Sequence, residues 1–247
     1  MDKKMKASAA VGEDRISELP DALLHHVLSL LPVDEAVRTS VLARRWRGLW
    51  KGVPVLRLVG PKKRFPSAED FDRFVNHLIS VRGDLPLVSC EVEAYLTWDD
   101  YAGSLRSPSR TKVLKLKHCG LWVHDMSFPS LKRLFLVECN FPEGYRVRIS
   151  APGVVSLRLH VGRGKTPLLE SMPLLERACI ELSYQCKDQC RGCGGDESCE
   201  GCHGYPVGSY RSVLLNSLSN AVNLELKDEP KVMLHLCYAV TVISRHE

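Results

Sequence analysis

The sequence predicts an α+β fold, in which a small three-helix unit precedes an α/β solenoid with short strands. Two observations predict this fold. Apolar residues recur at helical spacing from residue 21 to residue 42, and the segment ends on Trp46 and Trp50. From residue 53 onward, a frame of apolar-x-x-apolar-x-apolar recurs, and its last position falls at 58, 92, 116, 136, 159, 180 and 226. The intervals are therefore 34, 24, 20, 23, 21 and 46 residues, and the four consecutive intervals between 20 and 24 are typical of a solenoid.

Local signals predict the three helices of the first unit. Pro20 fits a first helical turn, where its missing N–H costs nothing, and Asp21 complements the positive helix end. Pro32 ends this helix, and Asp34 is expected to cap the second. A third short helix is expected to carry Arg44, Arg45, Trp46 and Arg47, with Trp50 near its end, and Gly48 weakens it. The apolar positions of the first two helices are Leu23, Leu24, Val27, Leu28 and Leu31, followed by Val37, Val41 and Leu42.

Residues 14–52 resemble an F-box, in particular its plant form. The resemblance rests on Leu19-Pro20, Leu23 with Leu28, Pro32, Val37 to Leu42, Arg44-Arg45-Trp46 and Leu49-Trp50. It implies binding to a Skp-type adaptor and, through it, to a cullin-RING ubiquitin ligase. The family's interface positions correspond to Leu19, Pro20, Leu23, Leu28, Leu31, Val37, Val41 and Trp46. For Trp50, the alternative role is to pack the F-box against the first repeat. For the whole stretch, the competing interpretation is an ordinary three-helix core.

Composition restricts the class of protein. The chain is 45% hydrophobic and 26% charged, with a net charge of +5 and no interleaving of aromatic and basic residues, so neither nucleic acid nor a membrane is an expected partner. Residues 1–13 are expected to be a disordered tail without a secretory signal. The thiols are then expected to be free, in the nucleus and/or the cytoplasm. The basic run 62–64 is read as a charged loop in preference to a nuclear-import patch.

A helix is predicted over 68–82, where Phe71, Phe74, Val75, Leu78 and Ile79 fall on one face. Gly83 is expected to end it. The aromatic pair is interpreted as core.

The repeats are predicted to stack one short strand each over a continuous core, in preference to a β-sandwich. The frames begin at Val53, Leu87, Thr111, Leu131, Val154, Leu175 and Ala221. The short connections favour irregular or 3₁₀ returns. The order of F-box, helix and degenerate repeats over 53–247 resembles the plant F-box/leucine-rich-repeat family, many of whose members carry a C-terminal FBD region. Compared with that family, the chain is expected to be short at its C-terminus, because the repeats thin out after Leu226.

A cysteine-rich insertion is predicted over 184–208, where the repeat interval rises from 21 to 46 residues. The pairs Cys190/Cys193 and Cys199/Cys202 have the two-residue spacing of zinc-binding thiolates. Their five-residue spacer is shorter than the ~12 residues of most zinc modules, and the loop does not match a RING. A solvated loop is therefore favoured over a metal site or a disulfide knot. The other cysteines, Cys90, Cys119, Cys139 and Cys179, are expected to be buried.

Sequence motifs for catalysis or cofactor binding are not found: there is no complete phosphate loop, no G-x-S-x-G and no H-E-x-x-H. The resemblance implies a non-catalytic substrate-recognition adaptor that needs no cofactor, with an unknown protein as substrate. Two alternatives remain: a truncated competitor that binds the Skp-type adaptor without presenting substrate, and a metal-binding protein built on the cysteine loop.

Overall fold

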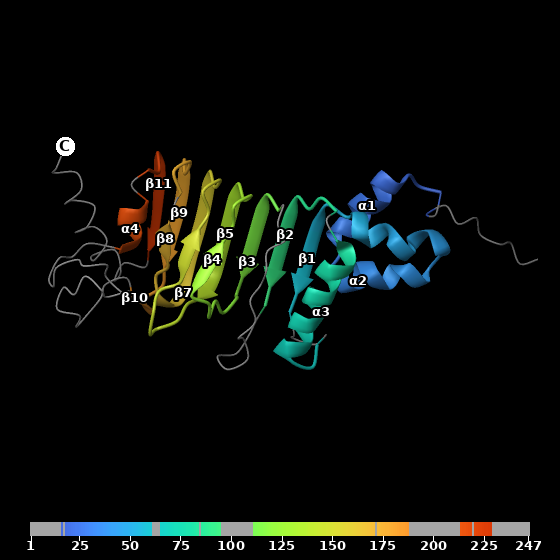
Figure 1. Cartoon of the computed structure of the whole chain (residues 1–247), viewed down its shortest axis with the longest axis horizontal. Coiled ribbons are helices and arrows are strands. Elements are labelled where there is room, and N and C mark those ends of the chain that lie inside the picture. The colour runs from blue at the N-terminus through green and yellow to red at the C-terminus, as the bar shows by residue number, and fades with distance from the viewer. Residues whose placement is uncertain are drawn as a thin grey trace, which may run out of the picture.

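The computed structural model describes residues 16, 18–60, 65–83, 85–94, 111–170, 172–187, 213–218 and 220–228. The molecule is elongated, with the N-terminal helices at one end and a parallel sheet extending to the other (Figure 1). The predicted tail 1–13, the basic run 62–64 and the greater part of the predicted cysteine insertion lie outside the described residues.

Four short helical segments form the first unit: α1 (Asp21–Leu30), α2 (Val33–Arg38), η1 (Thr39–Val41) and η2 (Arg44–Gly52). Pro20 and Pro32 precede the two α-helices with extended ψ angles of 145° and 144°. Pro32 follows the end of α1 as predicted, whereas Pro20 is the cap residue before α1 and does not lie in its first turn. The cap assigned to Asp34 is wrong, because α2 begins directly after Pro32 and Asp34 lies in its first turn. The third segment is a 3₁₀ helix that extends to Gly52, and it contains the predicted residues with Trp50 near its end.

The first unit and the sheet share one hydrophobic core. Leu24, Leu28, Trp46, Leu49 and Trp50 are buried in the same cluster as the first strands. A polar contact also crosses the junction, because Arg57 Nε donates to the Ser29 carbonyl at 3.0 Å. The helical unit is therefore packed against the solenoid, and Trp50 belongs to the core that they share.

Helix α3 (Ala68–Arg82) has the predicted limits. The Ser67 hydroxyl accepts from the Asp70 amide at 3.1 Å, and Gly83 follows the helix with φ of 66°, a value that favours glycine. Arg82 fixes the C-terminal end, since its Nη2 donates to the carbonyls of Val53 at 2.7 Å and Pro86 at 2.8 Å. The buried face of α3, with Phe71, Val75 and Leu78, covers the first strands.

Seven strands form the path of an eight-stranded parallel sheet, and along this path spatial order follows sequence order. They are β1 (Val55–Val59), β2 (Ser89–Glu93), β3 (Val113–Lys117), β5 (Arg133–Asn140), β7 (Ser156–Lys165), β9 (Arg177–Leu182) and β11 (Asn223–Asp228). The last positions of the sequence frames stand side by side: Leu58, Val92, Leu116, Leu136, Leu159, Ile180 and Leu226. The predicted solenoid is confirmed, and the sandwich is excluded.

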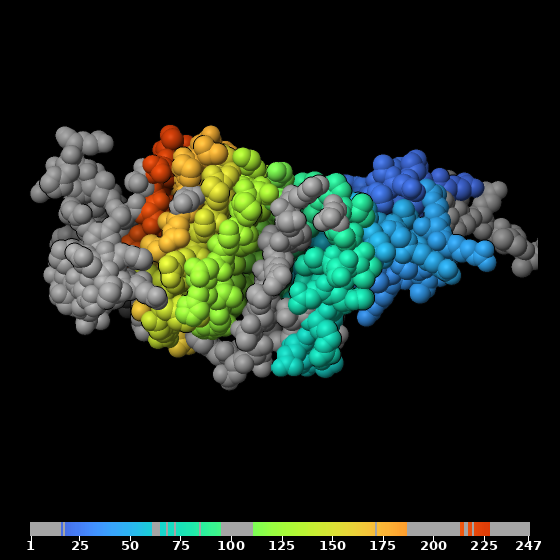
Figure 2. All heavy atoms as spheres, viewed as in Figure 1, coloured from blue at the N-terminus to red at the C-terminus, as the bar shows by residue number. Residues whose placement is uncertain are grey.

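A second layer carries the chain back between the main strands. The short strands β4 (Asp125–Ser127), β6 (Arg148–Ser150) and β8 (Leu168–Glu170) form their own parallel sheet. The predicted irregular returns are therefore partly wrong, since three of them contain a strand. The two-residue strand β10 (Cys186–Lys187) pairs with β7, and α4 (Val213–Ser217) precedes β11. The repeats follow one another along the molecule from the helical end (Figure 2).

The repeat cysteines mostly serve as small core residues. Cys90, Cys119 and Cys139 are buried as predicted, whereas Cys179 is only half-buried, because it lies on the solvent-facing side of β9. Buried thiols donate along the solenoid: Cys119 Sγ lies 3.8 Å from the Val92 carbonyl and Cys139 Sγ 3.5 Å from that of Leu116. Burial also raises the pKa of Cys139 well above its ordinary range.

Burial raises the pKa of the Cys90 thiol to about 12. The unfolding free energy of the protein therefore depends on pH in the alkaline range. The unfolded thiol ionises near pH ~8.5, so this contribution to stability is complete below that pH and is lost as the pH rises toward 12. Between pH ~8 and ~10.5, wild type should lose roughly 2–3 kcal/mol more unfolding free energy than Cys90→Val. Urea unfolding at both pH values measures the difference, and parallel pH dependences in the two proteins would contradict it.

Candidate F-box interface

Helix α1 has two apolar faces with different surroundings. Leu24 and Leu28 are 1% exposed and face the core. On the other side, Leu23, Val27 and Leu30 are 51%, 47% and 59% exposed. These three residues follow i, i+4, i+7 spacing, so they form one continuous row along the helix, which we call the α1 stripe. A helix this short that exposes three large apolar side chains is typical of a protein-binding surface.

A second exposed apolar group lies in η1 and the turn that follows it. Val41 and Leu42 are 86% and 69% exposed, and we call them the η1 pair. Their backbone is held by local hydrogen bonds: the Thr39 hydroxyl donates to the Ala36 carbonyl at 2.7 Å, and the Leu42 amide donates to the Thr39 carbonyl at 3.0 Å. The pair is thus displayed by a fixed turn at the end of α2.

The eight predicted interface residues fall into three groups. Pro20, Leu23 and Val41 are exposed, while Leu19, Leu31 and Val37 are half-buried. Leu28 and Trp46 are 1% and 6% exposed, so in this structure they belong to the core beneath the surface. The prediction of the interface omitted Val27, Leu30 and Leu42. The helical spacing included Val27, but only the position of the core shows which side of α1 stays open.

An ion pair positions the start of α1 against η2. Arg45 Nη2 lies 2.5 Å from Asp21 Oδ1 and donates to the Leu19 carbonyl at 2.7 Å. Arg38, Arg44 and Arg47 of the same unit are exposed. The unit therefore presents both apolar and basic side chains to solvent, a combination that protein–protein interfaces use.

The solvent-facing side of the main sheet is a second candidate surface, which we call the open face. Its central row runs through Arg57, Glu91, Lys115, Phe135, Arg158, Cys179 and Glu225. These side chains are half-buried or exposed, in contrast to the buried residues between them. An array of polar side chains on a stacked sheet suits recognition of an extended partner.

Neither the metal-site prediction nor a membrane span gains support from the described part of the chain. The candidate ligands Cys190, Cys193, Cys199 and Cys202 lie outside it. Within it, no three His, Cys, Asp or Glu side chains are grouped so as to hold a metal ion. A search of the same residues finds no helix with the length and apolar character needed to cross a bilayer.

Comparisons with known proteins identify both parts of the chain. The family described as F-box domain matches residues 16–58. A putative F-box/FBD/LRR-repeat protein of Arabidopsis thaliana is 36% identical over 200 residues, covering 72% of this chain and 43% of the relative. An F-box/LRR-repeat protein of the same plant is 46% identical over 173 residues, covering 66% of this chain and 42% of the relative. An F-box/FBD/LRR-repeat protein is 31% identical over 214 residues, covering 70% and 48%.

The similarity extends from the F-box into the repeats, but the chain spans less than half the length of these curated relatives. The predicted kinship with plant F-box/leucine-rich-repeat proteins is confirmed.

Proposed function

We propose that this chain is a non-catalytic adaptor of a Skp–cullin–F-box ubiquitin ligase. The proposal rests on the fact that the chain belongs to the plant F-box/leucine-rich-repeat proteins. The F-box would bind the Skp-type adaptor and the repeats would bind the substrate protein. We also propose that it acts in the nucleus or cytoplasm, where the free thiols found among the described residues are expected.

One observation carries the F-box part of this proposal: the α1 stripe and the η1 pair are exposed on a firmly packed unit. Leu23, Val27, Leu30, Val41 and Leu42 are each at least 47% exposed. Directly beneath them, Leu24, Leu28 and Ala36 are at most 3% exposed, so the surface has a rigid support. An apolar groove on the partner would cover the row on α1, which is a common mode of helix recognition.

The mechanism that follows is one of proximity. The adaptor itself forms and breaks no covalent bond. By binding the ligase at one end and a substrate at the other, it raises the effective concentration of substrate lysines near the charged ubiquitin-carrier enzyme. The shared core of the F-box and the first repeats suits this role, because it fixes the distance and orientation between the two surfaces.

Binding of the purified full chain to a plant Skp-type adaptor tests the proposal. We expect a stable complex that elutes as one species in size-exclusion chromatography and that takes up the N-terminal domain of a cullin. Circular dichroism of the same preparation establishes that the chain is folded. A folded chain that captures no adaptor would refute the ligase role. Capture of the adaptor without the cullin domain would refute the assembly with a ligase.

A further inference from the structure

The two halves of the open face, taken along the solenoid, differ in their charge. Over β1 to β3 its central charges are partly neutralised, because Glu91 lies between the two cations Arg57 and Lys115. Glu91 Oε1 is 2.6 Å from Lys115 Nζ, and Glu91 Oε2 is 3.4 Å from Arg57 Nη1. This half has little charge left with which to attract an ionic partner.

The half formed by β5, β7 and β9 carries three exposed arginines, Arg133, Arg158 and Arg177. Among the described residues, none of the three makes an ion pair with a carboxylate. Two acidic residues of β9 and the adjacent strand β11 have partners of their own. Glu181 faces His160 at 3.9 Å, and Glu225 pairs with Lys227 at 3.1 Å.

The positions of the arginines follow from the strand register. Arg133, Ser156, Arg177 and Asn223 form one row across the four strands β5, β7, β9 and β11. Adjacent strands lie ~4.8 Å apart, so the Cα atoms of Arg133 and Arg177 are separated by roughly 10 Å. Arg158 stands two residues further along β7, in the row that contains Phe135 and Cys179.

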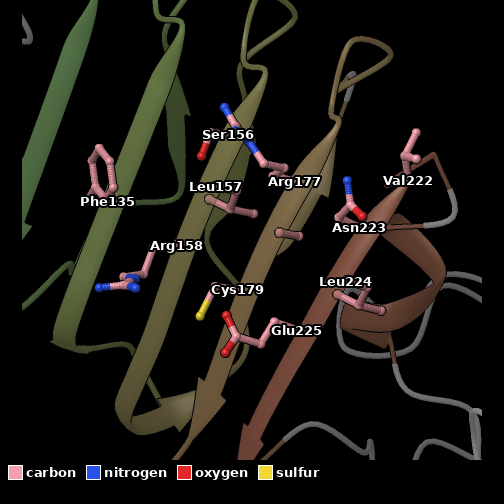
Figure 3. A pocket seen from close by; sticks show the side chains of 11 residues that line it. Phe135, Ser156, Leu157, Arg158, Arg177, Cys179, Val222, Asn223, Leu224 and Glu225 are labelled. Atoms are coloured by element: carbon pink, nitrogen blue, oxygen red, sulfur yellow. The ribbon is translucent and has the colours of Figure 1, made fainter.

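Two of these arginines, Arg158 and Arg177, line a shallow pocket that also has apolar walls. Its lining includes Phe135, Arg158, Arg177, Val222 and Leu224 (Figure 3). In the same view, Arg158 projects on the Phe135 side of β7, and Glu225 extends toward Cys179. Guanidinium groups that make no ion pair among the described residues, placed beside exposed apolar side chains, can accept a ligand that carries both negative charge and an apolar group.

We propose that this half of the open face binds an acidic, extended segment of the substrate protein. The segment would carry two or more Asp or Glu residues within about four positions, next to an apolar side chain. An extended peptide rises ~3.4 Å per residue, so carboxylates two or three positions apart span ~7–10 Å. This matches the separation of roughly 10 Å between the Cα atoms of Arg133 and Arg177. Each planar guanidinium can hold one carboxylate with two parallel hydrogen bonds. The inference rests on the proposed substrate role of the repeats.

Synthetic peptides test the substrate class. The probe is a fluorescein-labelled ten-residue peptide with Asp at alternate positions flanking a central Leu, and its control carries Asn at the same positions. Fluorescence anisotropy with the full chain should show at least about tenfold tighter binding of the acidic peptide. The double substitution Arg133→Gln/Arg177→Gln should remove about tenfold of that affinity, since two charge-assisted contacts are lost.

The matched control is Arg44→Gln/Arg73→Gln, which removes the same charge from exposed positions in η2 and α3. This control is needed because the chain has a net charge of +5, which attracts any acidic peptide. Equal loss in both double variants would overturn the proposal, as would equal binding of the Asp and Asn peptides. Stronger binding of a peptide with one phosphoserine in place of all the Asp residues would also overturn the acidic class.

Adaptor capture by Arg133→Gln/Arg177→Gln distinguishes this inference from the proposed function. We expect the variant to bind the Skp-type adaptor as wild type does, because both positions lie in the repeats. Failure of the adaptor experiment with intact peptide binding would refute only the ligase role. Intact adaptor capture without selective peptide binding would refute only the acidic substrate class.

Discussion

The double substitution Leu23→Asp/Val41→Asp is expected to abolish capture of a Skp-type adaptor while the protein stays folded. Leu23 is 51% exposed and Val41 86% exposed, so neither side chain contributes much to the core. In an interface, each would be desolvated, and a buried unpaired carboxylate is costly. A loss of about 2 kcal/mol or more per position corresponds to a roughly thousandfold weaker complex. Isothermal titration calorimetry with the purified adaptor measures this change.

A control with the same chemistry is available at the other end of the chain. Leu174 and Val222 are also exposed hydrophobic residues, at 53% and 79%, and both lie in the repeats. We expect Leu174→Asp/Val222→Asp to bind the adaptor with unchanged affinity. Urea unfolding of both double variants shows whether the core is intact. Wild-type affinity in a folded Leu23→Asp/Val41→Asp variant would place the interface elsewhere.

The main sheet was predictable because two constraints act on the same positions. Alternation places the second and third frame residues on one side of each strand, and stacking requires equivalent positions to meet in neighbouring strands. Val92, Leu116 and Leu136 accordingly stand in register. The second layer gave no such signal. Strand β4 has the burial pattern exposed, buried, exposed, with Met126 as its single buried residue, and one residue establishes no period.

The helical ends and the interface were harder to predict, because they depend on packing. Asp34 and Pro32 both suit a helix start, and the helix begins at Val33, directly after the proline and one residue before Asp34. Leu23 and Leu28 have equally favourable spacing along α1, yet one is exposed and the other buried. The sequence identifies a helix with two apolar faces, whereas the position of the core determines which face remains for a partner.

The substitution Leu136→Ala is expected to cost the largest amount of folding free energy among the changes considered. Leu136 is 0% exposed, in the centre of β5, between Leu116 and Leu159 of the adjacent strands. Removing its isobutyl group leaves a cavity that neighbours on both sides cannot fill, at a cost of about 3–5 kcal/mol. The urea midpoint followed by circular dichroism should fall accordingly.

The matched control is Leu226→Ala, the same change at the equivalent frame position of β11. Leu226 is only partly buried, and among the described strands β11 pairs with β9 alone. Because less surface is buried and the site can relax at the end of the sheet, we expect a cost of about 1 kcal/mol. In a solenoid stabilised by contacts between neighbouring repeats, the same substitution should cost more unfolding free energy at the centre than at the end. Equal losses at positions 136 and 226 would mean that residues beyond the described strands extend the core past β11.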